Sequence, residues 1–162
     1  MNEIIPHENK ELLARILGGA QNREYIDVVR DVQQQITDQA ELIEVPLVHH
    51  FAPGVYMRQM DAKAGTLVVS KMHRTEHMNV LLSGSLTVAT ENGIEYLKAP
   101  AVIKSMPGTK RVGYFHEDSS WITVHPTDST DLEEIEKQVI VPDKEIDQFL
   151  ASLQNPKCKE IE

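Results

Sequence analysis

The chain has 162 residues and a formal net charge of −9 at pH 7. This length suits one domain with a sizeable core, and the acidity argues against a general nucleic-acid-binding or anionic-membrane surface. The single cysteine, Cys158, excludes an intrachain disulfide, and no apolar run approaches the roughly 20 residues of a membrane-spanning helix. Residues 1–10 lack the long apolar core of a secretory signal. We therefore expect a soluble, intracellular protein.

Residues 1–44 have the pattern of a helical extension. A short helix is predicted near residues 9–17, before the helix-breaking pair Gly18-Gly19. A longer helix is predicted over residues 23–40. Its apolar residues recur at helical spacing as Tyr25, Val29, Val32 and Ile36. We expect this stripe to pack on the core of its own domain; the alternative is a contact with a second copy of the chain.

Residues 45–127 have the pattern of a β domain. Runs rich in Val, Leu, Thr and aromatic residues are broken by turn signals about every ten residues. A strong signal is Asn92-Gly93, because both residues tolerate the positive φ angles of a tight hairpin turn. Such short strands indicate an antiparallel sandwich or barrel, and we expect about eight strands between Val48 and His125.

After residue 127 a helical pattern returns and continues over residues 128–162. Thr130 and Glu133 fit a capping box, with Thr130 as the cap of a helix. A further short helix is predicted over residues 143–153. The predicted organisation is an N-terminal helical extension (1–44), a β-barrel (45–127), and a C-terminal helical segment with its tail (128–162).

The stretch at residues 65–84 organises the β domain. Two apolar runs flank a polar turn that carries His73 and His77. Imidazoles gathered at a strand turn suit a divalent metal, because neutral imidazole is a ligand of Zn²⁺, Fe²⁺, Ni²⁺ and Mn²⁺. A third ligand must come from another strand, and His125 and His50 are the candidates. The alternative interpretation is a hairpin with solvated histidines.

The same stretch resembles the first motif of the cupin family, which is a glycine, a His-x-His pair, a glutamate and a second glycine. The residues at the motif's positions are Gly65, Lys71, His73, His77 and Gly84. The spacing is met, but Lys71 stands at the position of the first histidine and His77 at that of the glutamate.

The second cupin motif is matched only in part. Its glycine, proline, glycine, histidine and asparagine positions hold Pro100, Met106, Gly108, Arg111 and Phe115. The resemblance covers about residues 48–126 and implies a mainly β fold, the cupin double-stranded β-helix or jelly-roll barrel, here with helices at both ends. It also implies that His73 and His77 point into the barrel. Lys71 and Arg111, if they point inward too, would repel a metal ion and attract a carboxylate or phosphate.

A looser resemblance concerns residues 107–125 and the following run TDLEEIE, which are similar to small cupin-like proteins of tailed bacteriophages. This resemblance implies a setting, the cytoplasm of a bacterium or of a phage-infected host, or else association with a virion. It implies no particular reaction.

Two functions follow from these patterns. The first is a metal-dependent cupin that binds or acts on a small polar or anionic molecule. The second is a non-catalytic structural or interaction module, so the sequence leaves open whether the protein is an enzyme. The residues assigned are His73, His77 and His125 for the metal, with His50, Lys71, Glu76 and Arg111 for the ligand. Glu76 has three possible roles: metal ligand, partner of an imidazole, or surface carboxylate. We also expect a homo-oligomer, because small cupins commonly pair, and no nucleic-acid or membrane partner.

Overall fold

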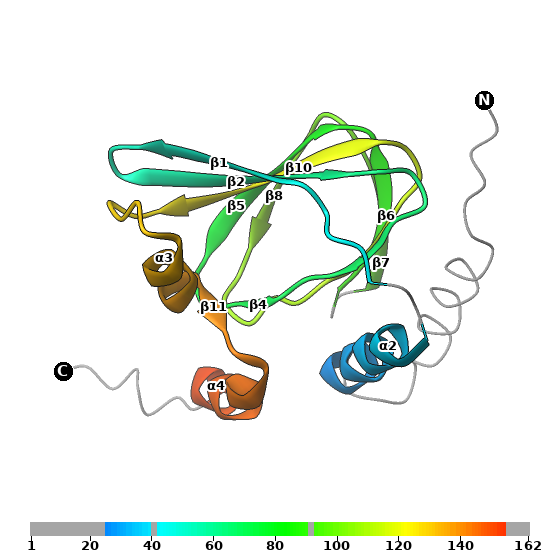
Figure 1. The fold of residues 1–162 in the computed structure, drawn as a ribbon. Coiled ribbons are helices and arrows are strands. Elements are labelled where there is room, and N and C mark those ends of the chain that lie inside the picture. The colour runs from blue at the N-terminus through cyan, green and yellow to red at the C-terminus, as the bar shows by residue number, and fades with distance from the viewer. Residues whose placement is uncertain (1–24, 40–41, 91–92, 155–162) are drawn as a thin grey trace.

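The computed structural model describes residues 25–39, 42–90 and 93–154 (Figure 1). The helices are α2 (Tyr25–Gln39), α3 (Leu132–Val139), α4 (Ile146–Gln154) and the short 3-10 helix η2 (Asp143–Glu145). The strands are β1 (Leu47–Ala52), β2 (Val55–Ala62), β3 (Leu67–Val69), β4 (Met72–His73), β5 (His77–Ser83), β6 (Ser85–Thr90), β7 (Gly93–Lys98), β8 (Ala101–Ser105), β9 (Val112–Phe115), β10 (Ser119–Pro126) and β11 (Ile140–Val141). None of these helices combines the length and the apolar content needed to cross a membrane. The helix expected near residues 9–17 lies outside the described residues.

Two antiparallel sheets face each other. The five-stranded sheet has the order β1-β2-β10-β5-β8, and the four-stranded sheet has the order β3-β9-β6-β7. With β1 and the short β4 set aside, the strands from β2 to β10 are divided between the sheets in the order of an eight-stranded jelly roll, in which the consecutive strands β6 and β7 pair within one sheet. The predicted mainly β jelly roll with helices at both ends is therefore confirmed. The two sheets are separate hydrogen-bonded ladders in the described part of the chain, and not one closed barrel.

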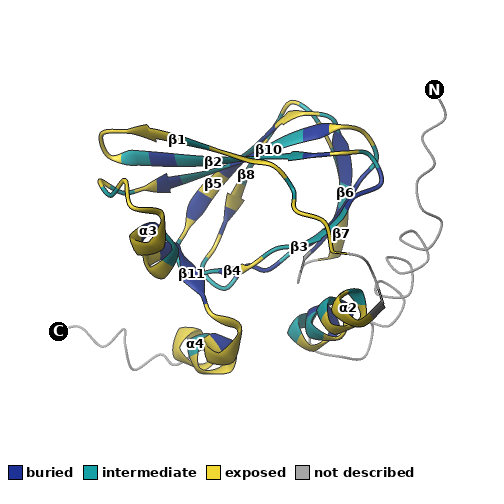
Figure 2. Cartoon of the chain, in the orientation of Figure 1, coloured by how far each residue is buried: buried dark blue, intermediate teal, exposed yellow. Residues whose placement is uncertain are grey.

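The register of the five-stranded sheet decides which side chains share its inner face. Antiparallel pairing sets β2 against β10 and β10 against β5, and alternate residues of each strand point to the same side. Three inner rows result: Tyr56, His125 and His77; Arg58, Thr123 and Asn79; Met60, Trp121 and Leu81. The inner face therefore changes from aromatic and histidine, through polar, to apolar along the strands. Figure 2 shows buried residues along β2, β5 and β6, whereas β1 and most of α3 are exposed.

Helix α2 covers the outer face of the four-stranded sheet. Its valines Val28, Val29 and Val32 are buried against Ala89, Val112 and Tyr114. The Tyr25 hydroxyl lies 2.7 Å from the carbonyl oxygen of Ala89 and 2.8 Å from that of Lys110, and can donate to either. The predicted stripe thus packs on its own domain, as expected. The alternative, in which the stripe contacts a second copy, is wrong, because burial of roughly 1.5–3 kcal/mol per large apolar side chain is already achieved within the chain.

The C-terminal elements pack against one end of the sheets. Strand β11 pairs with β4 and sets Ile140 opposite His73, while Ile135 and Val139 of α3 pack on Tyr56. The cap of α3 differs from the prediction: it is Asp131, not Thr130. The Asp131 carboxylate accepts hydrogen bonds from the backbone nitrogens of the second and third residues of the helix, at 2.9 and 3.3 Å. This satisfies two of the amides that a helix start leaves without partners, so the helix begins one residue later than predicted.

Candidate functional site

A cavity of about 470 Å³ lies between the two sheets and reaches α3. One part of its wall is apolar and is formed by Met60, Val68, Leu86, Val88, Phe115 and Trp121. The other part is polar and is formed by His49, Arg58, Ser70, Lys71, His73, Asn79, Arg111, Thr123 and Glu136. The division follows the rows of the five-stranded sheet, in which Arg58 and Met60 belong to neighbouring rows.

Three histidines from three strands meet at the polar end. The ring centroids of His73 and His77 are 4.3 Å apart, those of His77 and His125 are 4.8 Å apart, and those of His73 and His125 are 5.6 Å apart. His73 lines the cavity, whereas His77 and His125 are buried behind it. The structure thus brings together the three histidines that the sequence proposed as metal ligands.

All three imidazoles are held in the neutral form. Burial, followed by the charges of neighbouring imidazoles and of Arg58 and Arg111, lowers the pKa of His73 to about 3. Burial, together with His77 and Arg58, lowers the pKa of His125 to about 4. Burial also lowers the pKa of His77, against the opposing hydrogen bond to a backbone carbonyl. A neutral imidazole is the form that binds a metal or accepts a hydrogen bond.

Two ring nitrogens of this trio are buried without a hydrogen-bond partner among the described residues, Nε2 of His77 and Nδ1 of His125. The other nitrogen of His77, Nδ1, lies 2.9 Å from the carbonyl oxygen of Thr75 and must donate to it, which leaves the lone pair on Nε2. Metal-binding histidines are often oriented in this way. The donor chemistry therefore suits a divalent metal. The arrangement is not that of a formed metal site, since no three His, Cys, Asp or Glu side chains of residues 25–39, 42–90 and 93–154 are placed to hold an ion.

Two of the proposed ligand-binding residues lie outside the cavity. Glu76 is exposed and forms an ion pair with Lys104. His50 is exposed on β1, and its Nε2 lies 3.1 Å from Oε1 of Gln59. Neither side chain lines the cavity, and each has its polar partner elsewhere on the surface.

The other two proposed ligand-binding residues, Lys71 and Arg111, line the cavity. Arg111 directly precedes β9, and its Nη1 donates a hydrogen bond of 2.6 Å to the hydroxyl of Ser105. Its charge contributes to the lowered pKa values of His73 and His77, so its guanidinium lies close enough to affect these two imidazoles. Lys71 and Arg111 thus both face the cavity whose wall includes His73.

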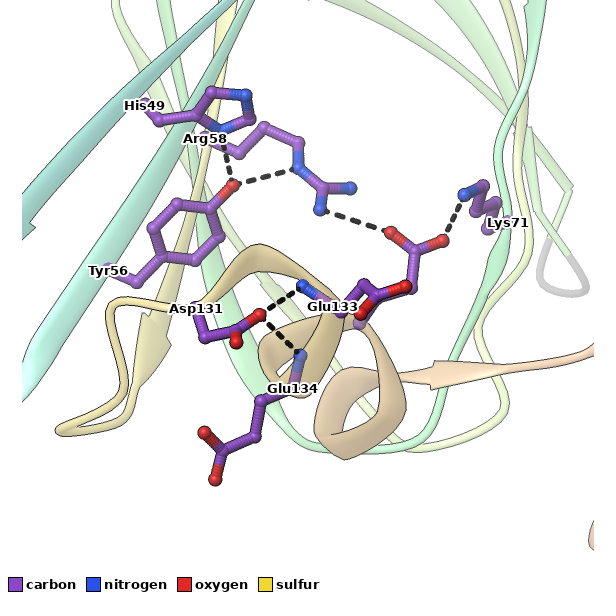
Figure 3. A network of polar contacts seen from close by, with 8 residues as sticks. His49, Tyr56, Arg58, Lys71, Asp131, Glu133 and Glu134 are labelled. Atoms are coloured by element: carbon purple, nitrogen blue, oxygen red, sulfur yellow. Dashed lines mark hydrogen bonds and ion pairs between the residues drawn. The ribbon is translucent and has the colours of Figure 1, made fainter.

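A network of polar contacts joins β1, β2 and the cavity mouth to α3 (Figure 3). Lys71 forms an ion pair with Glu136 of α3, and Nη2 of Arg58 lies 3.6 Å from the other oxygen of that carboxylate. Nε of Arg58 donates to the hydroxyl of Tyr56 at 3.1 Å, and this hydroxyl lies 2.7 Å from Nδ1 of His49. Arg58 is therefore held in place by a buried phenol and reaches a carboxylate at the edge of the cavity.

Arg58 and Glu136 were missed by reasoning from the sequence, although each had a usable signal. Arg58 lies two residues from both Tyr56 and Met60, so strand alternation places it on their face. Glu136 lies four residues after Leu132, so the two share a helix face. The sequence does not indicate that the strand face with Arg58 and the helix face with Glu136 meet.

No protein-family model and no curated protein matches the chain. Solved structures resemble it in fold. A cupin protein from Bacteroides fragilis is 17% identical over 57% of this chain and 86% of its own, with a TM-score of 0.43. KdgF from Halomonas sp. is 16% identical over 57% of this chain and 88% of its own, with a TM-score of 0.45. Salicylate 1,2-dioxygenase from Pseudoaminobacter salicylatoxidans is 10% identical over 72% of this chain and 34% of its own, with a TM-score of 0.48. The strand order, rather than these likenesses, identifies the fold, and the comparisons give no support to the phage resemblance.

Proposed function

We propose that this protein binds a small organic anion in the cavity between its two sheets. The observation that carries the proposal is the charge of the cavity wall. Arg58, Lys71 and Arg111 line the cavity with Glu136 as the one carboxylate among its lining residues. The neighbouring imidazoles are neutral at pH 7, so the cavity is cationic inside a chain whose net charge is −9. Such a contrast favours an anionic ligand.

The size and the unpaired polar atoms of the cavity support the same proposal. A volume of about 470 Å³ falls within the roughly 300–1,000 Å³ range of small-molecule sites. Two side chains in the wall, Asn79 and Thr123, have buried oxygens without a hydrogen-bond partner among the described residues. Buried polar atoms of this kind are normally paired with protein, water or a ligand, so these oxygens are available to orient a bound molecule.

Ligand-induced thermal stabilisation tests the proposal. We would screen organic anions, with neutral and cationic analogues of matched shape, against the full chain and a Val88→Phe variant. Val88 lines the cavity, so the added ring occupies ligand space. A ligand at about 100 times its Kd stabilises a protein by about 2.7 kcal/mol, which raises the Tm of a chain of this size by roughly 5–10 °C. Anions should stabilise the wild type and not the variant; no stabilisation by any class of molecule would contradict the proposal.

A second candidate function is metal-dependent chemistry at His73, His77 and His125. The specific observation is the pair of unpartnered ring nitrogens on His77 and His125. Zn²⁺, Fe²⁺, Ni²⁺ or Mn²⁺ would suit imidazole ligands, and a bound ion would supply Lewis-acid chemistry there. In this arrangement the Thr75 carbonyl fixes the orientation of His77, and Arg58 binds the anionic part of the substrate.

Elemental analysis of protein purified without chelator tests the second candidate. Wild type should hold a divalent metal in stoichiometric amount. The double substitution His73→Ala with His77→Ala should abolish it while circular dichroism shows the fold unchanged. The matched control is His50→Ala, because His50 is exposed on β1 outside the cavity. Equal metal content in the double variant and the wild type would exclude the trio as the site.

A further inference from the structure

We propose that the ligand is a monocarboxylate with an apolar body, and that its carboxylate displaces that of Glu136 from Arg58; this rests on the anion binding proposed above. Helix α3 brings the Glu136 carboxylate to the edge of the cavity, where it lies 3.6 Å from Nη2 of Arg58. Glu136 thus occupies, from within the chain, the place of a ligand's carboxylate. The helix-borne carboxylate and a ligand compete for one guanidinium.

The contact between Glu136 and Arg58 is loose. A separation of 3.6 Å exceeds the length of an N–H···O hydrogen bond, so the pair is ionic and not a bidentate fork. The other oxygen of Glu136 is held by Lys71, whose side chain is 61% exposed. Exposed ion pairs contribute little to stability because water and salt screen them. A carboxylate that can approach Arg58 with two hydrogen bonds therefore replaces Glu136 at little cost.

The guanidinium of Arg58 is preorganised for a carboxylate ligand. Its Nε is committed to the hydroxyl of Tyr56, whose side chain is fully buried, so the guanidinium is held in one position. Its terminal nitrogens have no hydrogen-bond acceptor at normal length within the described residues. The planar fork of arginine matches a carboxylate, and a fixed fork loses little conformational freedom on binding.

The apolar part of the wall indicates the chemistry and size of the rest of the ligand. Met60 and Trp121 form the inner row next to Arg58, and two residues along a strand span about 7 Å. A carboxylate on Arg58 therefore places its body against Met60 and Trp121, with Val88 and Phe115 of the facing sheet also in the wall. One aromatic ring or a short alkyl chain fits this distance. A multiply charged phosphate has no apolar group to pack against the apolar wall. The wall therefore favours a carboxylate with an apolar body over a phosphate.

Isothermal titration calorimetry on the full chain tests the inference with benzoate and octanoate as probes. Acetate has the charge without the body, benzamide has the ring without the charge, and inorganic phosphate represents the other anion class. Benzoate or octanoate should bind at least tenfold more tightly than all three. Glu136→Gln removes the competing carboxylate and should tighten this binding about two- to fivefold, with a smaller gain at high salt.

Glu133→Gln is the matched control, since it makes the same charge change on an exposed residue of the same helix outside the cavity wall. It should leave affinity unchanged. Arg58→Lys keeps the charge but loses the fork, and should weaken binding; if that variant does not fold, the gain in Glu136→Gln still decides the matter.

Two results would overturn the inference while leaving cavity binding intact. One is benzamide or phosphate binding as tightly as benzoate in the wild type and not in Val88→Phe. The other is equal benzoate affinity in Glu136→Gln and Glu133→Gln. Absence of binding by every probe and by the wider panel would overturn both the inference and the proposed function.

Discussion

Lowering the pH from about 7 to about 5.5 should destabilise the fold through the histidine trio. The pKa of His73 falls from 6.5 to about 3 on folding, and that of His125 from 6.5 to about 4, with burial as the largest cause in each case. The unfolded chain therefore binds more protons than the folded chain between about pH 6.5 and those lower values. Stability is present above the unfolded pKa and is lost as the pH falls.

The magnitude follows from the two lowered pKa values. At about pH 5.5, one unit below the unfolded pKa, proton binding favours the unfolded state by about 1.4 kcal/mol per histidine, against about 0.2 kcal/mol at pH 7. Between pH 7 and pH 5.5, His73 and His125 together should therefore lower the free energy of unfolding by about 2.5 kcal/mol. The pKa of His77 is lowered as well, so it adds in the same direction. Carboxylates with lowered pKa values, such as Asp61, stay ionised in both states across this window and contribute little.

Urea unfolding in the presence of EDTA measures this loss without a contribution from metal release. The midpoint should fall by about 1 M between pH 7 and pH 5.5. His125→Gln should reduce the change of the midpoint with pH. His50→Gln, a change at an exposed residue on β1, should leave that pH dependence as it is in the wild type. A midpoint that does not move over this pH range would refute the assignment of the lowered pKa values to buried neutral imidazoles. The same holds if the midpoint of His125→Gln changes with pH as much as that of the wild type.

Three further predictions concern the scaffold. Val29→Ala, at a fully buried position of α2, should lower the free energy of unfolding by about 2–3 kcal/mol, while Val102→Ala at a residue 68% exposed should change it by less than about 0.5 kcal/mol; similar losses would mean that α2 does not pack on the sheet. Gly84→Ala should cost more than about 2 kcal/mol, because φ is +85° and the added Cβ would lie 1.9 Å from the Ser119 hydroxyl oxygen. Gly93→Ala, with φ +118° and open space around the added Cβ, isolates the backbone part of that cost and should be milder. Self-association stays a prediction, now without the α2 stripe as its contact, and light scattering that gives the 18.3 kDa mass of one chain at micromolar concentration would contradict it.

The sequence by itself determined the local elements. Turn signals such as Asn92-Gly93 and the alternation of strand residues predicted an antiparallel β domain, and the period of Val29 and Val32 predicted an amphipathic helix that packs on it. These features are local, since a strand's alternation or a helix's stripe depends only on residues a few positions apart. The proximity of His73 and His77 is also a local feature, because a single turn connects them.

Only the tertiary structure decided which faces meet. Strand pairing between β10 and β5 brings His125 to His77, and the docking of α3 brings Glu136 to Arg58. Alternation tells that Arg58 shares a face with Met60, but not that this face points inward or which segment lies opposite it. Inner and outer faces are set by the burial of apolar surface over the whole chain and by register between segments far apart in sequence, which no short window contains.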